Sequence, residues 1–137
     1  MESAFLHHVS VPTKDLAKAV PFYTEVLDFR QVTRPGFSIG GAWLRLGNAE
    51  VHITDVPLGT FPTTRTVGSD DIHFAIRVAD FASVIEILNR FGYRDDLQTD
   101  DPKRILIKPK SMAGYSQLYI MDYDFHLIEI NAAFKSS

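Results

Sequence analysis

Apolar and polar residues alternate in short runs along the chain, which is the pattern of half-buried β-strands. In residues 71–78, for example, Ile72, Phe74 and Ile76 face one way while His73 faces the other. We also expect a short strand that begins at Tyr93. We expect the main strands at 5–11, 29–33, 41–46, 49–54, 71–78, 104–108, 116–121 and 126–131.

Two longer segments instead have the spacing of amphipathic helices, at 15–27 and 80–91. Pro21 lies well inside the first, so we expect a kink or an early end there. Gly92 follows the second, which is typical of a left-handed C-terminal cap.

The order of these elements repeats. His8 and His73 each open a strand, and an Asp follows each of them seven residues later, at Asp15 and Asp80. Each half then has the order strand, helix and three strands. The sequence therefore predicts an α+β fold of two βαβββ modules, residues 1–67 and 68–137, whose sheets form a cup with the helices on the outer face.

Composition narrows the class of protein. The 137 residues are 45% hydrophobic and 23% charged, with a formal net charge of −3. The charge argues against nucleic acid as a partner, and no apolar run approaches the roughly 18 residues of a membrane span. The chain has no cysteine, which excludes disulfides and a thiolate nucleophile. With no visible signal peptide, we expect a soluble cytoplasmic protein.

Four strands place a metal-ligating residue type opposite their apolar side: His8, His52, His73 and Glu129. A single exposed His is more simply a solvated polar residue, but four such positions together favour a shared metal site. Imidazole and carboxylate suit Fe, Mn, Co, Ni or Zn, and two His with one carboxylate leave positions open for a substrate.

Several segments of the chain resemble the vicinal oxygen chelate superfamily. They are Leu6-His7-His8-Val9-Ser10-Val11, the stretch from Asp15-Leu16 through Phe22-Tyr23 to Val26-Leu27-Asp28-Phe29, Asp71-Ile72-His73-Phe74-Ala75-Ile76, and the segment from Gln117 to Ile130 with its Asp-x-Asp turn and Glu-bearing strand. The superfamily includes glyoxalase I, methylmalonyl-CoA epimerase, extradiol dioxygenases, fosfomycin-resistance enzymes and metal-free bleomycin-binding proteins.

The resemblance implies paired βαβββ modules and places His8, His73 and Glu129 on the three usual metal positions. His52 falls on the fourth, variable position, where glyoxalase I has a carboxylate and the epimerase a Gln. With His there, Glu129 is the one carboxylate left in the expected site, which argues against glyoxalase I activity. Tyr123 and Phe125 also depart from the family's turn, which more often carries Pro and Gly.

Further residues on the same faces are expected to bind the substrate: Trp43, Arg45, Gln117 and Tyr119. Arg45 would pair with a carboxylate or phosphonate, although a surface cation is an equal alternative. His7 and His126 fall on the other faces of their strands and are expected to be structural.

The sequence thus predicts a metal-dependent enzyme of lyase or isomerase type, with Glu129 and His52 as catalytic residues. The metal would chelate neighbouring oxygens of a small substrate and stabilise an enolate or oxyanion. An extradiol dioxygenase, a fosfomycin-resistance-type enzyme and a metal-free drug- or metabolite-binding protein are the alternatives. A homodimer is expected, with the modules pairing within one chain or between two.

Overall fold

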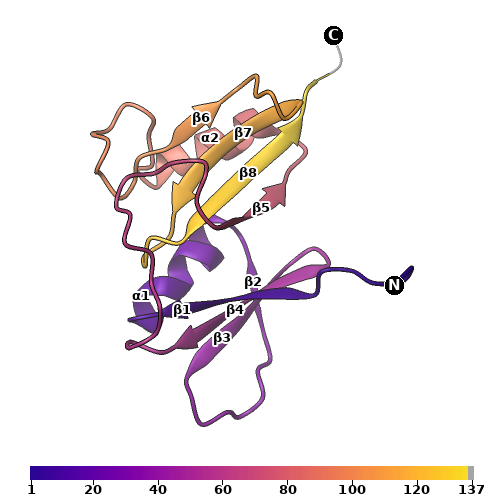
Figure 1. The fold of residues 1–137 in the computed structure, drawn as a ribbon, viewed down its shortest axis with the longest axis vertical. Coiled ribbons are helices and arrows are strands. Elements are labelled where there is room, and N and C mark those ends of the chain that lie inside the picture. Colours follow the sequence, from indigo (N-terminus) through magenta and orange to yellow (C-terminus); the bar gives the residue numbers. More distant parts are fainter. Residues whose placement is uncertain (136–137) are drawn as a thin grey trace. The chain divides into compact units, whose positions relative to one another are not determined.

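The computed structural model describes residues 1–135 and divides into two compact units, Met1–Phe61 and a second that begins at Pro62. Each unit contains one four-stranded sheet and its own helical segment (Figure 1). This confirms the predicted α+β fold of two βαβββ modules. The module boundary between 67 and 68 and the cup that would join the two sheets remain predictions.

The first unit contains six elements: β1 (His8–Thr13), α1 (Leu16–Pro21), the π-helical turn η1 (Phe22–Val26), β2 (Arg30–Val32), β3 (Gly41–Leu46) and β4 (Ala49–Asp55). The order in the sheet is β1-β4-β3-β2. β1 runs parallel to β4, and the other pairs are antiparallel. α1 contacts β3 and β4. Strand β1 begins three residues later than predicted, because Phe5 and Leu6 lie exposed before it.

Pro21 explains the form of the first helix. A proline inside a helix has no N–H to donate to the preceding turn. Here the α-helix ends at Pro21, and the next turn is wider, with the Leu27 N–H donating to the Phe22 carbonyl five residues back at 3.2 Å. The expected break is confirmed.

The second unit contains β5 (His73–Arg77), α2 (Phe81–Arg90), β6 (Leu106–Lys108), β7 (Tyr115–Met121) and β8 (Leu127–Ala133), with the sheet order β5-β8-β7-β6. β5 runs parallel to β8. The short strand expected at Tyr93 is reduced to one bridge between Arg94 and Arg104.

The two helices begin in the same way. Asp15 accepts a hydrogen bond from the Lys18 N–H, and Asp80 accepts from the N–H groups of Ala82 and Ser83. Each aspartate therefore satisfies first-turn donors that have no partner in the helix.

No described helix is long and apolar enough to cross a membrane.

The two helices also end in the same way, which confirms the sequence repeat. Asp28 and Gly92 both adopt left-handed backbone, with φ of 58° and 86°. Each is followed at once by a buried aromatic, Phe29 or Tyr93. Glycine adopts this conformation without cost, whereas aspartate tolerates it better than most residues.

The register of β7 and β8 separates two faces of the second sheet. Leu118 lies opposite Ile130 on the apolar face, and both side chains are at most 2% exposed. Gln117 and Glu129 belong to the other face, which we call the polar face. Figure 1 shows α2 along one side of this sheet, behind β7 in this view.

The polar face of the second sheet is partly covered, although the sequence predicted an open face. Val67, from the segment before β5, packs in a buried cluster with Tyr119, Met121 and Leu127. Phe125 packs against the same cluster. Met121 and Leu127 are apolar residues on this predominantly polar face, and Val67 shields them from water.

Candidate functional site

His73 and Glu129 form a close pair on the polar face of the second sheet. On the parallel strands β5 and β8, His73 lies opposite Leu127 and Glu129 lies opposite Ala75, so His73 and Glu129 are diagonal neighbours on one face. His73 Nε2 lies 3.1 Å from Glu129 Oε2. The other ring nitrogen, Nδ1, lies 2.7 Å from the Asp71 carbonyl oxygen. A carbonyl only accepts, so Nδ1 carries the proton and a neutral His73 has its lone pair at Nε2. A metal-ligating His typically has this arrangement.

The second carboxylate oxygen of Glu129 is held separately. The side-chain amides of Gln117 and Asn131 both donate to Oε1 at 2.8 Å. Burial raises the pKa of Glu129, but hydrogen bonds from the Asn131 and Gln117 amides, joined by one from His73 when its ring is doubly protonated, outweigh it and hold the pKa below its ordinary value. Glu129 is therefore a fixed carboxylate whose Oε2 faces His73.

Gln117 and Tyr119, predicted as substrate-binding residues, lie buried beside Glu129. The Gln117 amide also donates to the Tyr119 hydroxyl at 3.1 Å, and that hydroxyl lies 3.4 Å from Glu129 Oε2. Burial and the charge of Glu129 raise the pKa of Tyr119, so its phenol keeps its proton at neutral pH. These contacts position Glu129, and contact with a substrate remains a prediction for both residues.

In the first unit, three aromatic rings stack on the corresponding face. The His52 ring lies between His8, at 4.0 Å between centroids, and Trp43, at 4.2 Å. His8 Nδ1 lies 2.9 Å from His7 Nδ1. The structure thus brings together His8 with His52 in one unit and His73 with Glu129 in the other, as two pairs.

Glu50 is a buried carboxylate beside His52 that was not among the predicted site residues. It is 6% exposed, and its Oε2 lies 2.7 Å from His52 Nε2. Its Oε1 accepts from Arg45 Nη2 at 2.5 Å and from Nε at 3.0 Å. Glu129 is therefore not the one carboxylate on these faces. Glu50 is two residues from His52, so the same strand alternation could have found it.

These hydrogen bonds determine the pKa of Glu50 and the position of the proton on the His52 ring. Hydrogen bonds from His52 and then Arg45 lower the pKa of Glu50 to about 2. A carboxylate only accepts, so His52 carries its proton on Nε2 and, when neutral, has its lone pair on Nδ1. Arg45 was predicted to pair with an anionic substrate. Here its guanidinium binds Glu50, which leaves less of its charge for a ligand.

The lowered pKa of Glu50 predicts how stability depends on pH. An unfolded Glu titrates near pH 4.5, whereas the folded chain releases the Glu50 proton near pH 2. Glu50 therefore contributes stability that is fully present above about pH 4.5 and is lost as the pH falls towards 2. Urea unfolding midpoints between pH 6 and 2.5 should fall less steeply for Glu50→Gln than for the unchanged chain. Equal slopes would show that the Glu50 bonds add nothing to folding.

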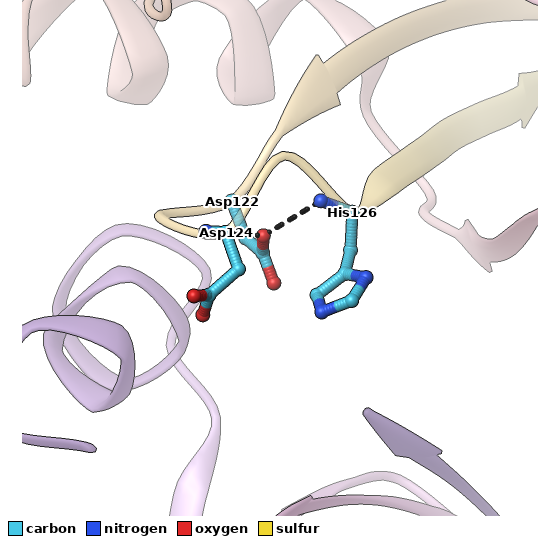
Figure 2. Close-up of side chains that lie close together, drawn as sticks. All are labelled: Asp122, Asp124 and His126. Atoms are coloured by element: carbon cyan, nitrogen blue, oxygen red, sulfur yellow. Dashed lines mark hydrogen bonds between the residues drawn. The ribbon is translucent and has the colours of Figure 1, made fainter. Parts of the chain in front are cut away.

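A third group of ligand types lies in the turn between β7 and β8. Asp122, Asp124 and His126 each offer a ligand atom, and these atoms all lie within 4.8 Å of one another (Figure 2). Asp122 Oδ1 also accepts from the N–H groups of Asp124 and His126, at 2.9 and 2.8 Å. These bonds support Phe125, whose φ of 68° is costly for a bulky residue. The group could hold a metal, and it also stabilises the turn.

The two carboxylates of this group are buried, each 5% exposed. From the sequence, the Asp-x-Asp turn was predicted only as a feature of the family resemblance, and His126 was predicted to be structural. The Asp-x-Asp-x-His spacing itself was the signal that could have indicated a third candidate site.

Comparison with known proteins identifies the family. The model of the Glyoxalase/Bleomycin resistance protein/Dioxygenase superfamily matches residues 5–108, well over half of the chain. The chain belongs to this superfamily. The predicted resemblance is thereby confirmed, and so is membership of a superfamily that consists mostly of enzymes and binds small molecules. Among curated proteins, none matches the chain.

Solved structures of the superfamily share the fold at low sequence identity. A Bacillus anthracis protein assigned to the glyoxalase family has a TM-score of 0.75 and 19% identity, with 96% of each chain covered. A glyoxalase family protein from Enterococcus faecalis has a TM-score of 0.67 and 22% identity, covering 96% of this chain and 99% of the other. The fosfomycin resistance protein FosX from Listeria monocytogenes has a TM-score of 0.67 and 16% identity, covering 96% and 94%. These similarities concern the fold alone.

Proposed function

We propose that this superfamily member is a metal-dependent isomerase or lyase that acts on a small substrate with oxygens on neighbouring carbons. The observation that carries the proposal is the His73 and Glu129 pair, whose facing atoms lie 3.1 Å apart. Each partner is held from its other side, His73 by the Asp71 carbonyl and Glu129 by two amides.

The donor set fits a divalent transition metal. Imidazole nitrogen and carboxylate oxygen are ligands for Fe, Mn, Co, Ni or Zn. We propose that His73 Nε2 and Glu129 Oε2 bind the metal together with His8 and His52. His52 would bind through Nδ1, because its Nε2–H faces Glu50. Asp71 and Glu50 contact these His ligands and would orient them. Substitution of such a supporting residue typically lowers metal affinity 10- to 100-fold.

A bound metal would supply Lewis-acid stabilisation of negative charge on the substrate oxygens. The residues of the chain supply the proton transfer. In an isomerisation, a base takes a proton from one carbon and returns it to the neighbouring carbon, while the hydroxyl proton passes from the first oxygen to the second, so atoms and charge balance. We propose that this base is His52, where His52 is not itself a metal ligand, or Glu129 with its coordination loosened. Proton uptake at the free His52 Nδ1 would leave an imidazolium stabilised by the Glu50 carboxylate, 2.7 Å from Nε2.

The remaining predicted residues would shape the substrate site. Trp43 covers one face of the His52 ring and excludes water there. Tyr119 keeps its phenolic proton and could donate it as a hydrogen bond to a substrate oxygen. We also propose a homodimer, because β1 and β5 are edge strands of their sheets and such edges invite pairing.

One comparison favours a second candidate function. The solved fosfomycin resistance protein has a similar fold, and the second candidate is accordingly a fosfomycin-resistance-type enzyme. The Arg45 guanidinium, nearly half of whose side chain is exposed, is the group that would bind the phosphonate. Its bonds to Glu50 make this candidate the weaker one.

Proton exchange tests the proposal with defined probes. The Mn²⁺-loaded chain should speed loss of the α C–H signal of dihydroxyacetone in D₂O, followed by proton NMR, above a Mn²⁺ blank. His52→Gln should slow this exchange about 100-fold if His52 is the base. Oxygen uptake with catechol, or opening of fosfomycin, without exchange would instead indicate one of the other reaction classes.

A further inference from the structure

A groove of about 750 Å³ lies on the apolar side of the second unit, between α2 and the sheet. The first half of α2 forms one wall, through Phe81, Ala82 and Ile85. Ser116 at the start of β7 and Ala132 near the end of β8 form the floor. Strand alternation places these two opposite each other on the face away from Glu129. The groove is therefore separate from the proposed metal site.

The groove exists because the side chains of the sheet become small at this end. The neighbouring register pair on the same face, Leu118 and Ile130, fills the space beneath α2. At the next pair, Ser116 and Ala132 replace these large residues. Protein interiors are normally packed without such gaps. The size is within the range of about 300–1,000 Å³ that is usual for small-molecule sites.

The lining of the groove combines apolar side chains with two lysines. Phe81, Ile85, Ile107 and Phe134 offer hydrocarbon surface, and Phe134 is 49% exposed. Two lysines complete the lining, Lys110 in the loop after β6 and Lys135 after β8. The Lys135 ammonium lies 3.9 Å from the Asp80 carboxylate, which caps α2. Lys110 is therefore the cation better placed to bind an anion.

We propose that this groove binds an amphipathic carboxylate, with its hydrocarbon tail between α2 and the sheet and its head group at Lys110. Apolar walls that bury a tail supply most of the affinity of such a site, and a few polar groups fix the orientation. The charge at the groove selects an anionic head over a cationic one.

The test uses dodecanoate below its micelle concentration, titrated calorimetrically into the full chain. Ala132→Leu and Ala82→Phe both fill the groove, and Ala82 is an exposed helical position where the larger side chain should not disturb folding. Each methylene of the dodecanoate tail that a filled groove leaves in water weakens binding about fourfold. We expect each variant to weaken binding at least about tenfold, and Lys110→Gln to weaken it about fivefold.

Matched controls lie outside the groove. Ala113→Leu enlarges an exposed loop residue, and Arg90→Gln removes an exposed cation at the end of α2; both should bind dodecanoate like the unchanged chain. Dodecyltrimethylammonium should bind at least about fivefold more weakly than dodecanoate. The proposal is overturned by equal binding of the two probes, by unchanged binding in the folded Ala82→Phe variant, or by no binding of dodecanoate at all.

Discussion

Replacing Glu129 with Gln should lower the affinity of the chain for Mn²⁺ or Ni²⁺ by at least about 100-fold, because it removes a ligand and its negative charge together. The substitution is close to isosteric. Gln117 and Asn131, which donate to Glu129 Oε1 at 2.8 Å, can still donate to an amide oxygen. The fold should therefore survive, so that loss of metal reports the ligand itself. Isothermal titration of each metal into the dialysed chain measures the change.

Two matched variants make this experiment specific. Glu86→Gln removes an exposed carboxylate on α2 and should leave metal affinity unchanged. Asp124→Asn alters the third candidate group, Asp122, Asp124 and His126. If Asp124→Asn abolishes metal binding while Glu129→Gln retains it, the metal belongs in the β7–β8 turn and the proposed site is wrong.

Leu118→Ala should cost about 3 kcal/mol of unfolding free energy, within the range of about 2–5 kcal/mol for a buried Leu. Leu118 is fully buried on the apolar face, opposite Ile107 on β6 and Ile130 on β8. Truncation removes hydrocarbon from the core and leaves a cavity that the sheet cannot fill. Urea unfolding followed by far-UV circular dichroism gives the value.

Leu58→Ala is the matched control for this loss. Leu58 is fully exposed, so the same chemical change should alter stability by less than about 0.5 kcal/mol. Because β7 and β8 also carry Gln117 and Glu129, Leu118→Ala should weaken metal binding somewhat as well. Equal stability losses for the two variants would contradict the assignment of the core to this face.

The sequence predicted the two-module fold because its signals were local and repeated. Alternation in 71–78 reflects a strand with one buried face, and the Asp15 and Asp80 caps mark helix starts by their own chemistry. Pro21 was recognised as a break for the same reason. The exact turn type after Pro21, and the shortening of the expected strand at Tyr93, depend on packing that no local pattern contains.

The candidate site was predicted only in part. His73 and Glu129 were assigned to one face by alternation, and the structure places their facing atoms in hydrogen-bonding distance. Glu50 was not predicted because it matches no metal position of the family, although strand alternation places it on the same face as His52. The cover by Val67 could not be predicted, since it comes from a segment without periodicity.

The central claim is that this superfamily member holds its metal with Glu129 and the three His residues. Elemental analysis after loading with Mn²⁺ or Ni²⁺ and exhaustive dialysis tests it most directly. We expect about one metal ion per site in the unchanged chain and in Asp124→Asn, and close to none in Glu129→Gln. An unchanged chain that retains no metal after loading, or a Glu129→Gln variant that retains a full complement, would contradict the account.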